Sequence, residues 1–154
     1  MLSVGETVAE FTLPDQAGQA VTWSSLRGTP VVVFFYPKAD TPGCTKEACA
    51  FRDLSAEFAA AGARVIGISA DPPKRQKAFD DKYTLGMPLL SDPDHAVLAP
   101  WGVWGEKKMY GKTVHGIVRT TVLFDADGRV AHVWSPVKVD GHVDQVLARV
   151  RSRT

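Results

Sequence analysis

Three short apolar runs along the chain predict the strands of a central sheet. They are Val31–Phe35, Arg64–Ser69 and Thr120–Phe124. Each is rich in β-branched or aromatic residues, which is typical of strands buried on both faces of a largely parallel sheet. A turn signal at Asp125–Gly128, followed by the apolar stretch Arg129–Trp134, predicts that the last of these strands returns as a hairpin.

Apolar residues recur at helical spacing between the predicted strands. The first such segment starts at Thr41-Pro42, with Thr as N-cap and Pro at the first helical position, and continues to Gly62. Pro73–Tyr83 predicts a second helix and Asp140–Val150 a third. This order of elements predicts an α/β fold over residues 1–154, a single domain with a central mixed sheet flanked by helices. Thioredoxin-like folds have this order.

Composition narrows the classes of partner. The chain has 154 residues with 18 Lys and Arg against 17 Asp and Glu, a net charge of +1 that gives no general attraction for nucleic acid or an anionic membrane. No apolar stretch reaches the length of a membrane span. The first ten residues carry two acids and no base, unlike the start of a signal peptide. We therefore expect a cytoplasmic protein, in which cysteines are kept reduced.

The candidate chemistry lies at the start of the first predicted helix. If Thr41 is the N-cap, Cys44 falls in the first turn, where unsatisfied N–H groups and the positive end of the helix dipole favour a thiolate. Cys44 also follows the carboxyl end of a strand, where open α/β sheets place their sites. The alternative is that Cys44 is a buried cysteine acting as a small hydrophobic residue.

Cys49, five residues further on, limits what the pair of cysteines can do. In an ideal helix their Cα atoms stand roughly 8.6 Å apart, beyond the limit of about 7 Å for a disulfide. A Cys44–Cys49 bond therefore requires the helix to unwind, which favours a conditional bridge over a permanent one. The C-x-x-C motif of dithiol oxidoreductases is absent, and two cysteines with His95 as the nearest histidine make a structural zinc site improbable.

At this segment the chain resembles the peroxiredoxins, specifically the bacterioferritin comigratory protein (peroxiredoxin Q) subfamily. The resemblance extends over nearly the whole chain. It rests on Tyr36-Pro37, Thr41-Pro42-Gly43-Cys44-Thr45, Glu47-Ala48-Cys49, Phe11–Asp15, Pro88–Asp92, Gly102–Lys108 and Gly116–Thr121.

The resemblance implies a role for five residues. Cys44 is implied as the peroxidatic cysteine, whose thiolate attacks a peroxide and becomes a sulfenic acid, and Cys49 as the resolving cysteine. Pro37 is implied to shield the thiolate, Thr41 to hydrogen-bond thiolate and peroxide, and Arg119 to support the thiolate and the developing negative charge. Reduction by thioredoxin or a similar dithiol, a monomeric state and the absence of metal, haem or flavin are also implied.

The residues themselves leave simpler roles open. Thr41 is an evident N-cap, and Pro37 suits the end of a strand because proline disrupts a ladder. Arg119 alternates with Ile117, Thr121 and other apolar positions, so a cation on that face needs a polar or anionic partner. A carboxylate would serve as well as a thiolate.

We therefore expect a thiol peroxidase that reduces hydrogen peroxide and organic hydroperoxides, with an intramolecular Cys44–Cys49 disulfide as its oxidised product. The same residues would serve a peroxide sensor that passes its disulfide to a partner protein, and sustained peroxide consumption separates the two. A thioredoxin-type reductase is the third alternative, and an insulin-reduction assay tests it.

Overall fold

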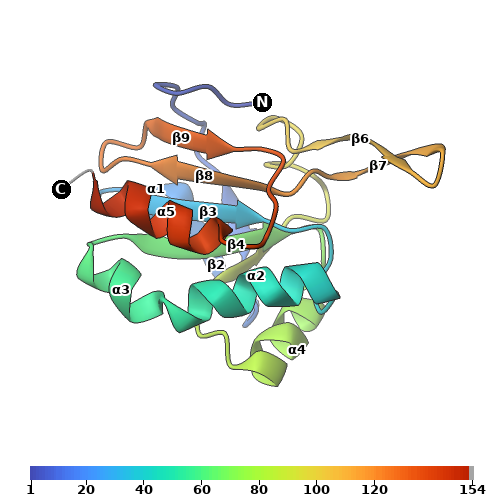
Figure 1. The fold of residues 1–154 in the computed structure, drawn as a ribbon, viewed down its shortest axis with the longest axis horizontal. Coiled ribbons are helices and arrows are strands. Elements are labelled where there is room, and N and C mark those ends of the chain that lie inside the picture. Colours follow the sequence, from blue (N-terminus) through green and yellow to red (C-terminus); the bar gives the residue numbers. More distant parts are fainter. Residues whose placement is uncertain (153–154) are drawn as a thin grey trace.

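The central sheet has five strands in the order β5-β4-β3-β8-β9 (Figure 1). The computed structural model describes residues 1–152, without the side chain of Met109. The strands are Val31–Phe35 (β3), Arg64–Ser69 (β4), Leu89–Ser91 (β5), Thr120–Phe124 (β8) and Val130–Trp134 (β9). β3, β4 and β5 run parallel, whereas β8 is antiparallel to β3 and β9 to β8. The predicted α/β fold with a mixed sheet and a final hairpin is confirmed.

The sheet separates two apolar cores, because successive side chains of a strand point to opposite faces. Val32 and Phe34 of β3 belong to the first core, which the larger helices cover. Val31, Val33 and Phe35 belong to the second core on the opposite face. All five side chains are completely buried, as their continuous apolar run predicts.

Four helices contribute buried residues to the first core. They are α2 (Pro42–Asp53), α3 (Ser55–Ala60), α4 (Pro73–Tyr83) and α5 (His142–Arg151). The helix predicted from Thr41 to Gly62 is in fact two helices, because Leu54 leaves helical geometry with φ −104° and ψ 14°. The second core is covered by the short helix α1 (Trp23–Leu26) and by the hairpin of β1 (Thr12–Pro14) and β2 (Ala20–Thr22).

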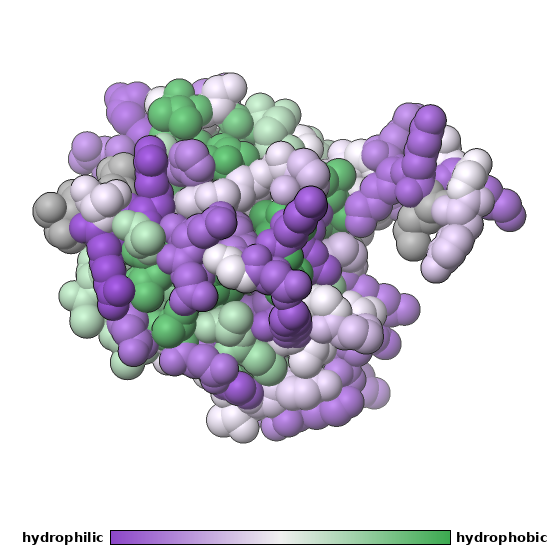
Figure 2. Space-filling view, viewed as in Figure 1, coloured by the Kyte–Doolittle hydropathy of each residue, from purple (hydrophilic) through white to green (hydrophobic). Residues whose placement is uncertain are grey.

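Strands β6 (Trp104–Met109) and β7 (Lys112–Ile117) form an antiparallel hairpin that the apolar pattern does not predict. This hairpin, called the β6–β7 arm below, projects from the body beyond the sheet (Figure 1). Figure 2 shows its surface as mostly hydrophilic, with an open notch between the arm and the body. Its base joins β8 through Val118 and Arg119.

Asp92 follows β5 directly and leads the chain into a series of turns. Asp92 is 1% exposed, and its carboxylate accepts the amides of Ala96, Val97 and Leu98 at 2.8–2.9 Å. Asp92 therefore caps the segment that follows it, which continues in turns rather than in a regular helix. Among the helices of residues 1–152, none has the length and apolar character needed to cross a membrane.

Candidate active site at Cys44

Cys44 is the third residue of α2 and lies in its first turn, just beyond the carboxyl end of β3. Its side chain is almost completely buried, at 1% exposure. The amide of Thr45 donates to the Thr41 carbonyl at 2.8 Å, so the amides of Gly43 and Cys44 precede the intrahelical hydrogen bonds. These amides and the helix dipole place positive partial charge around the sulfur, an environment that favours a thiolate.

Arg119 reaches the sulfur from the connection between β7 and β8. Its Nη2 atom donates to Cys44 Sγ at 3.2 Å, and its Nη1 atom donates to Glu47 Oε1 at 2.9 Å. Gly43 makes this approach possible, because a Cβ atom there would lie only 3.2 Å from Nη2. The sequence left a sulfur or a carboxylate as the partner of Arg119, and the guanidinium contacts both at once.

Glu47 is the residue that sequence reasoning missed, although it was part of the motif. It is completely buried, its Oε1 atom accepts from Arg119, and its Oε2 atom has no hydrogen-bond partner among residues 1–152. Burial raises the pKa of Glu47 from 4.5 to about 7, against the opposing effect of the Arg119 charge. The signal was present in the sequence, since residues three apart on a helix share a face and Glu47 follows Cys44 by three.

Two bases experience the positive charge of this site. Burial, with the Arg119 charge as a second cause, lowers the pKa of His142 in α5 to about 4. His142 is therefore neutral at pH 7, and its Nε2 atom lies 2.8 Å from Thr121 Oγ1. Burial and Arg119 also lower the pKa of Lys107 in β6, whereas the nearby Cys44 sulfur raises it. Arg119 therefore lowers the pKa of both bases, in each case as a smaller cause than burial.

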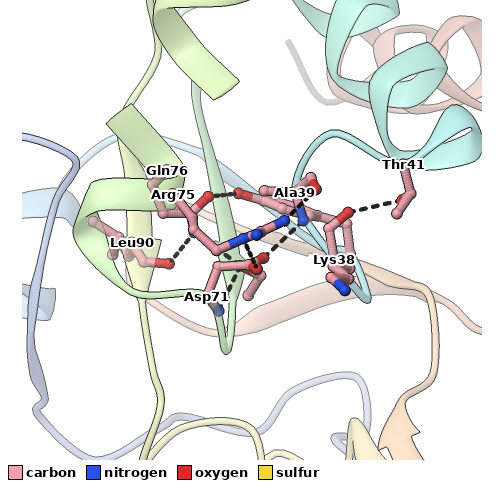
Figure 3. A network of polar contacts seen from close by, with 9 residues as sticks. Lys38, Ala39, Thr41, Asp71, Arg75, Gln76 and Leu90 are labelled. Carbon is pink, nitrogen blue, oxygen red and sulfur yellow. Dashed lines mark hydrogen bonds and ion pairs between the residues drawn. The ribbon is translucent and has the colours of Figure 1, made fainter. Parts of the chain in front are cut away.

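Thr41 occupies the N-cap position of α2, but its hydroxyl does not cap the helix. It donates instead to the Lys38 carbonyl at 2.8 Å (Figure 3). Pro37 lies in the same loop, two residues after β3 ends. The amide of the preceding residue, Tyr36, donates to the Ile68 carbonyl of β4, which is the last hydrogen bond between these two segments before the proline. The structure thus agrees with Pro37 as a strand terminator, and it places Pro37 and Thr41 on the loop that leads to the sulfur.

A buried carboxylate holds this loop against β4 and α4 (Figure 3). Asp71 Oδ2 accepts the Ala39 amide and the Ser69 hydroxyl, each at 2.7 Å, while Asp71 Oδ1 pairs with Arg75 at 3.3 Å. Gln76 extends the network by donating to Ser69 at 2.9 Å. Because every one of these partners lies outside α2, the loop is fixed independently of the helix that carries Cys44.

A second anchor lies at Asp40, whose φ of 62° is in the left-handed region. Its carboxylate accepts the Tyr83 hydroxyl at 2.7 Å and pairs with Lys82 at 3.0 Å. Both partners are in the last turn of α4. Hydrogen bonds from Tyr83 and Lys82 lower the pKa of Asp40, so the carboxylate stays charged and the anchor persists through the neutral range.

Cys49 lies in the same unbroken helix as Cys44, and both cysteines are free. Cys44 is buried, whereas Cys49 is partly buried and packs against the first core. This arrangement agrees with the expectation that an intact helix keeps the two sulfurs apart. Of the five predicted site residues, Cys44 and Arg119 are in direct contact, Thr41 and Pro37 share the preceding loop, and Cys49 is not joined to Cys44.

The fold and this site match known proteins over most of the chain. Residues 4–133 match the model of the AhpC/TSA family. A putative peroxiredoxin of Mycobacterium tuberculosis (strain H37Rv) is 50% identical over 142 residues, which cover 92% of this chain and 90% of the relative. Peroxiredoxin Bcp of Escherichia coli K12 is 47% identical over 146 residues, covering 95% and 94%.

A solved structure of Xanthomonas campestris peroxiredoxin Q superposes with a TM-score of 0.88 and 42% sequence identity. It covers 92% of this chain, and this chain covers 90% of it. The thioredoxin-like architecture predicted from the order of elements is confirmed by this match. The chain therefore belongs to the AhpC/TSA family, as a peroxiredoxin of the Bcp and peroxiredoxin Q kind.

Proposed function

We propose that this protein reduces hydrogen peroxide and organic hydroperoxides at Cys44 and resolves the product with Cys49. Its family membership supports a peroxidase that takes a peroxide as substrate and a thiol as reductant. The observation that carries the proposal is the contact between Arg119 Nη2 and Cys44 Sγ at 3.2 Å, at the amino end of a helix. A cation and a helix terminus together favour the nucleophilic thiolate.

In the first step the Cys44 thiolate attacks one peroxide oxygen, and the O–O bond breaks. The sulfur becomes a sulfenic acid, and the other oxygen leaves as hydroxide or alkoxide and takes up a proton to give water or an alcohol. Arg119 lies beside the sulfur and stabilises the negative charge that develops on the leaving oxygen. Thr41 supplies a further donor when its hydroxyl turns from the Lys38 carbonyl toward the peroxide.

In the second step the Cys49 thiol attacks the sulfenic sulfur, and water leaves as the disulfide forms. The first turns of α2 have to unwind for this step, because an ideal helix holds the two Cα atoms roughly 8.6 Å apart. A dithiol protein such as thioredoxin then exchanges with the disulfide, which restores both thiols and leaves the donor oxidised. We place this cycle in a cytoplasmic monomer without a metal or an organic cofactor.

The test is the intact mass of the reduced protein after one equivalent of hydrogen peroxide, combined with peptide mapping. A loss of about two mass units confined to Cys44–Cys49 supports the cycle. Addition of oxygen to Cys44 without a disulfide would remove Cys49 as the resolving residue. No change at either cysteine would overturn the proposal.

Two variants complete the test. Cys44→Ser should abolish peroxide consumption in the presence of a thioredoxin system. Cys49→Ser should retain the first oxidation and lose the intramolecular disulfide. Repeated turnover of the unmodified protein with that reductant distinguishes the peroxidase from a sensor that is oxidised once and passes its disulfide to a partner.

A further inference from the structure

Lys107 belongs to the β6–β7 arm but is not an ordinary surface lysine. In an antiparallel pair, residues that face each other across the strands project on the same side. Lys107 pairs with Val114, and the next pair on the same face toward the base of the arm is Gly105 with Gly116. Lys107 therefore shares its face of the arm with two facing glycines.

The two glycines leave that face without side chains, and the lysine stem packs over one of them, Gly116, while the space over Gly105 stays open. Lys107 Cδ lies 3.7 Å from the position that a Cβ atom on Gly116 would take. Since Gly116 is closer to the base of the arm than Val114, the side chain leans toward that base. The chain continues from this base to Arg119, which contacts Cys44.

The electrostatic environment places the ammonium group within the field of the site. It is half-buried, and its pKa is lowered by burial and by the Arg119 charge and raised by the Cys44 charge. Arg119 has Glu47 and Cys44 as partners, yet Lys107 has no hydrogen bond or ion pair within residues 1–152. A partly desolvated cation beside another cation is stabilised by an additional anion. The residues described supply none besides those that already serve Arg119.

The arm also stands apart from the body of the protein (Figure 2). Figure 2 shows the notch between the arm and the body, open to solvent. Lys108 and Glu106 alternate with Lys107 along β6 and project from the opposite face of the arm, where Glu106 approaches His115 at 3.9 Å. Of these charged residues of β6, Lys107 alone lies on the glycine face of the arm.

We propose that Lys107 determines substrate specificity by favouring peroxides that carry an anionic group, such as a carboxylate, over neutral peroxides of the same size. The inference rests on the proposed function, because it assumes that peroxides react at Cys44. The anionic group takes no part in the redox step. It binds at Lys107 while the hydroperoxide group is reduced at the sulfur, so the chemistry of the cycle is unchanged.

The experiment compares cumene hydroperoxide with its para-carboxylate derivative, which differ by one negative charge remote from the O–O bond. The quantity measured is the ratio of kcat/KM for the carboxylate to kcat/KM for the neutral peroxide. Lys107→Gln should lower this ratio about 10-fold, the lower end of the effect of local charge on association rates. Lys107→Arg should retain the ratio, because it keeps the cation.

Lys108→Gln is the matched control, since it removes the same charge from the adjacent residue on the other face of the arm. Its ratio should stay within about 2-fold of that of the unmodified protein, because charges displaced from the site contribute little once screened. Raising the salt concentration from about 0.01 M to about 1 M should lower the ratio of the unmodified protein toward that of Lys107→Gln. This last measurement needs no variant.

An equal loss on both peroxides in Lys107→Gln would overturn the proposal, because it would place Lys107 in support of the thiolate instead. A ratio that is insensitive to salt, or one that falls equally in Lys108→Gln, would also overturn it. Failure of the proposed function has a different signature, since the unmodified protein would then consume neither peroxide.

Discussion

Replacing Glu47 with Gln should alter how the stability of the fold depends on pH. Glu47 is completely buried, and burial raises its pKa from 4.5 to about 7 in the folded protein. The folded state thus binds the proton more tightly than the unfolded chain does. The stability that Glu47 contributes is therefore fully present below pH 4.5 and is lost as the pH rises through about 7. A difference of about 2.5 pH units corresponds to about 3 kcal/mol.

The glutamine has the same shape, still accepts from Arg119, and does not titrate. The free energy of unfolding of Glu47→Gln minus that of the unmodified protein should therefore increase by about 3 kcal/mol between pH 4.5 and pH 7. A constant offset from the exchange of carboxylate for amide does not affect this slope. Urea unfolding of the reduced proteins, followed by tryptophan fluorescence at several pH values, measures it.

Glu6→Gln provides the control, because Glu6 is exposed and far from Cys44 in the sequence. It removes one carboxylate from the chain without touching the buried group. A difference between Glu47→Gln and the unmodified protein that stays flat from pH 4.5 to pH 7 would refute the reasoning. It would mean that Arg119 keeps Glu47 ionised in the folded state at little cost.

Three further predictions concern the groups around the sulfur. Arg119→Met should lower kcat/KM for hydrogen peroxide by about 10- to 100-fold, because Cys44 loses a charge-assisted hydrogen bond. Stopped-flow kinetics measures this rate, and an unchanged value would contradict the assigned contact. Gly43→Ala should reduce the same rate several-fold with little loss of stability, since its methyl group would lie 3.2 Å from Nη2 of Arg119. A crystal structure of the variant should show the guanidinium displaced. Asp71→Asn should destabilise the fold by about 1–3 kcal/mol, because the buried Ala39 amide loses a charged acceptor. Chemical denaturation measures the free energy of unfolding, and an unchanged value would mean that the network contributes no stability.

Four of the five strands of the central sheet and the larger helices could be predicted because burial imposes a period on their sequences, whereas the three-residue edge strand β5 was not predicted. β3 is apolar at every position since both of its faces are covered, and α4 begins and ends at the predicted residues. The β6–β7 arm carries no such period. Its strands are held mainly by their pairing with each other, so its largely polar sequence, including Lys107 and Lys108, satisfies no apolar template.

Part of the site also followed from local rules, while the rest depends on contacts made in three dimensions. The helix start at Pro42 placed Cys44 in the first turn. Strict alternation predicted that Arg119, Thr121 and Ile117 share one face of a strand. Ile117 instead packs in the second core, because the chain leaves regular strand geometry between β7 and β8. The direction of the Thr41 hydroxyl was not predictable, since the choice among nearby acceptors is decided by the loop.

The anchoring of the 36–41 loop divides the site into two parts, a loop that stays fixed to the rest of the fold and the helix α2, which can unwind. Asp71 and Asp40 tie the loop to β4, the turn after it and α4. Arg119 comes from the connection before β8, the strand that pairs with β3 on the side away from β4. Cys44 lies on α2, together with Glu47 and Cys49. Opening of that helix would withdraw the sulfur while the loop stays in place. Once a dithiol has reduced the disulfide, the site would therefore re-form by the refolding of about two helical turns against the fixed loop, a process on the submicrosecond scale of helix formation.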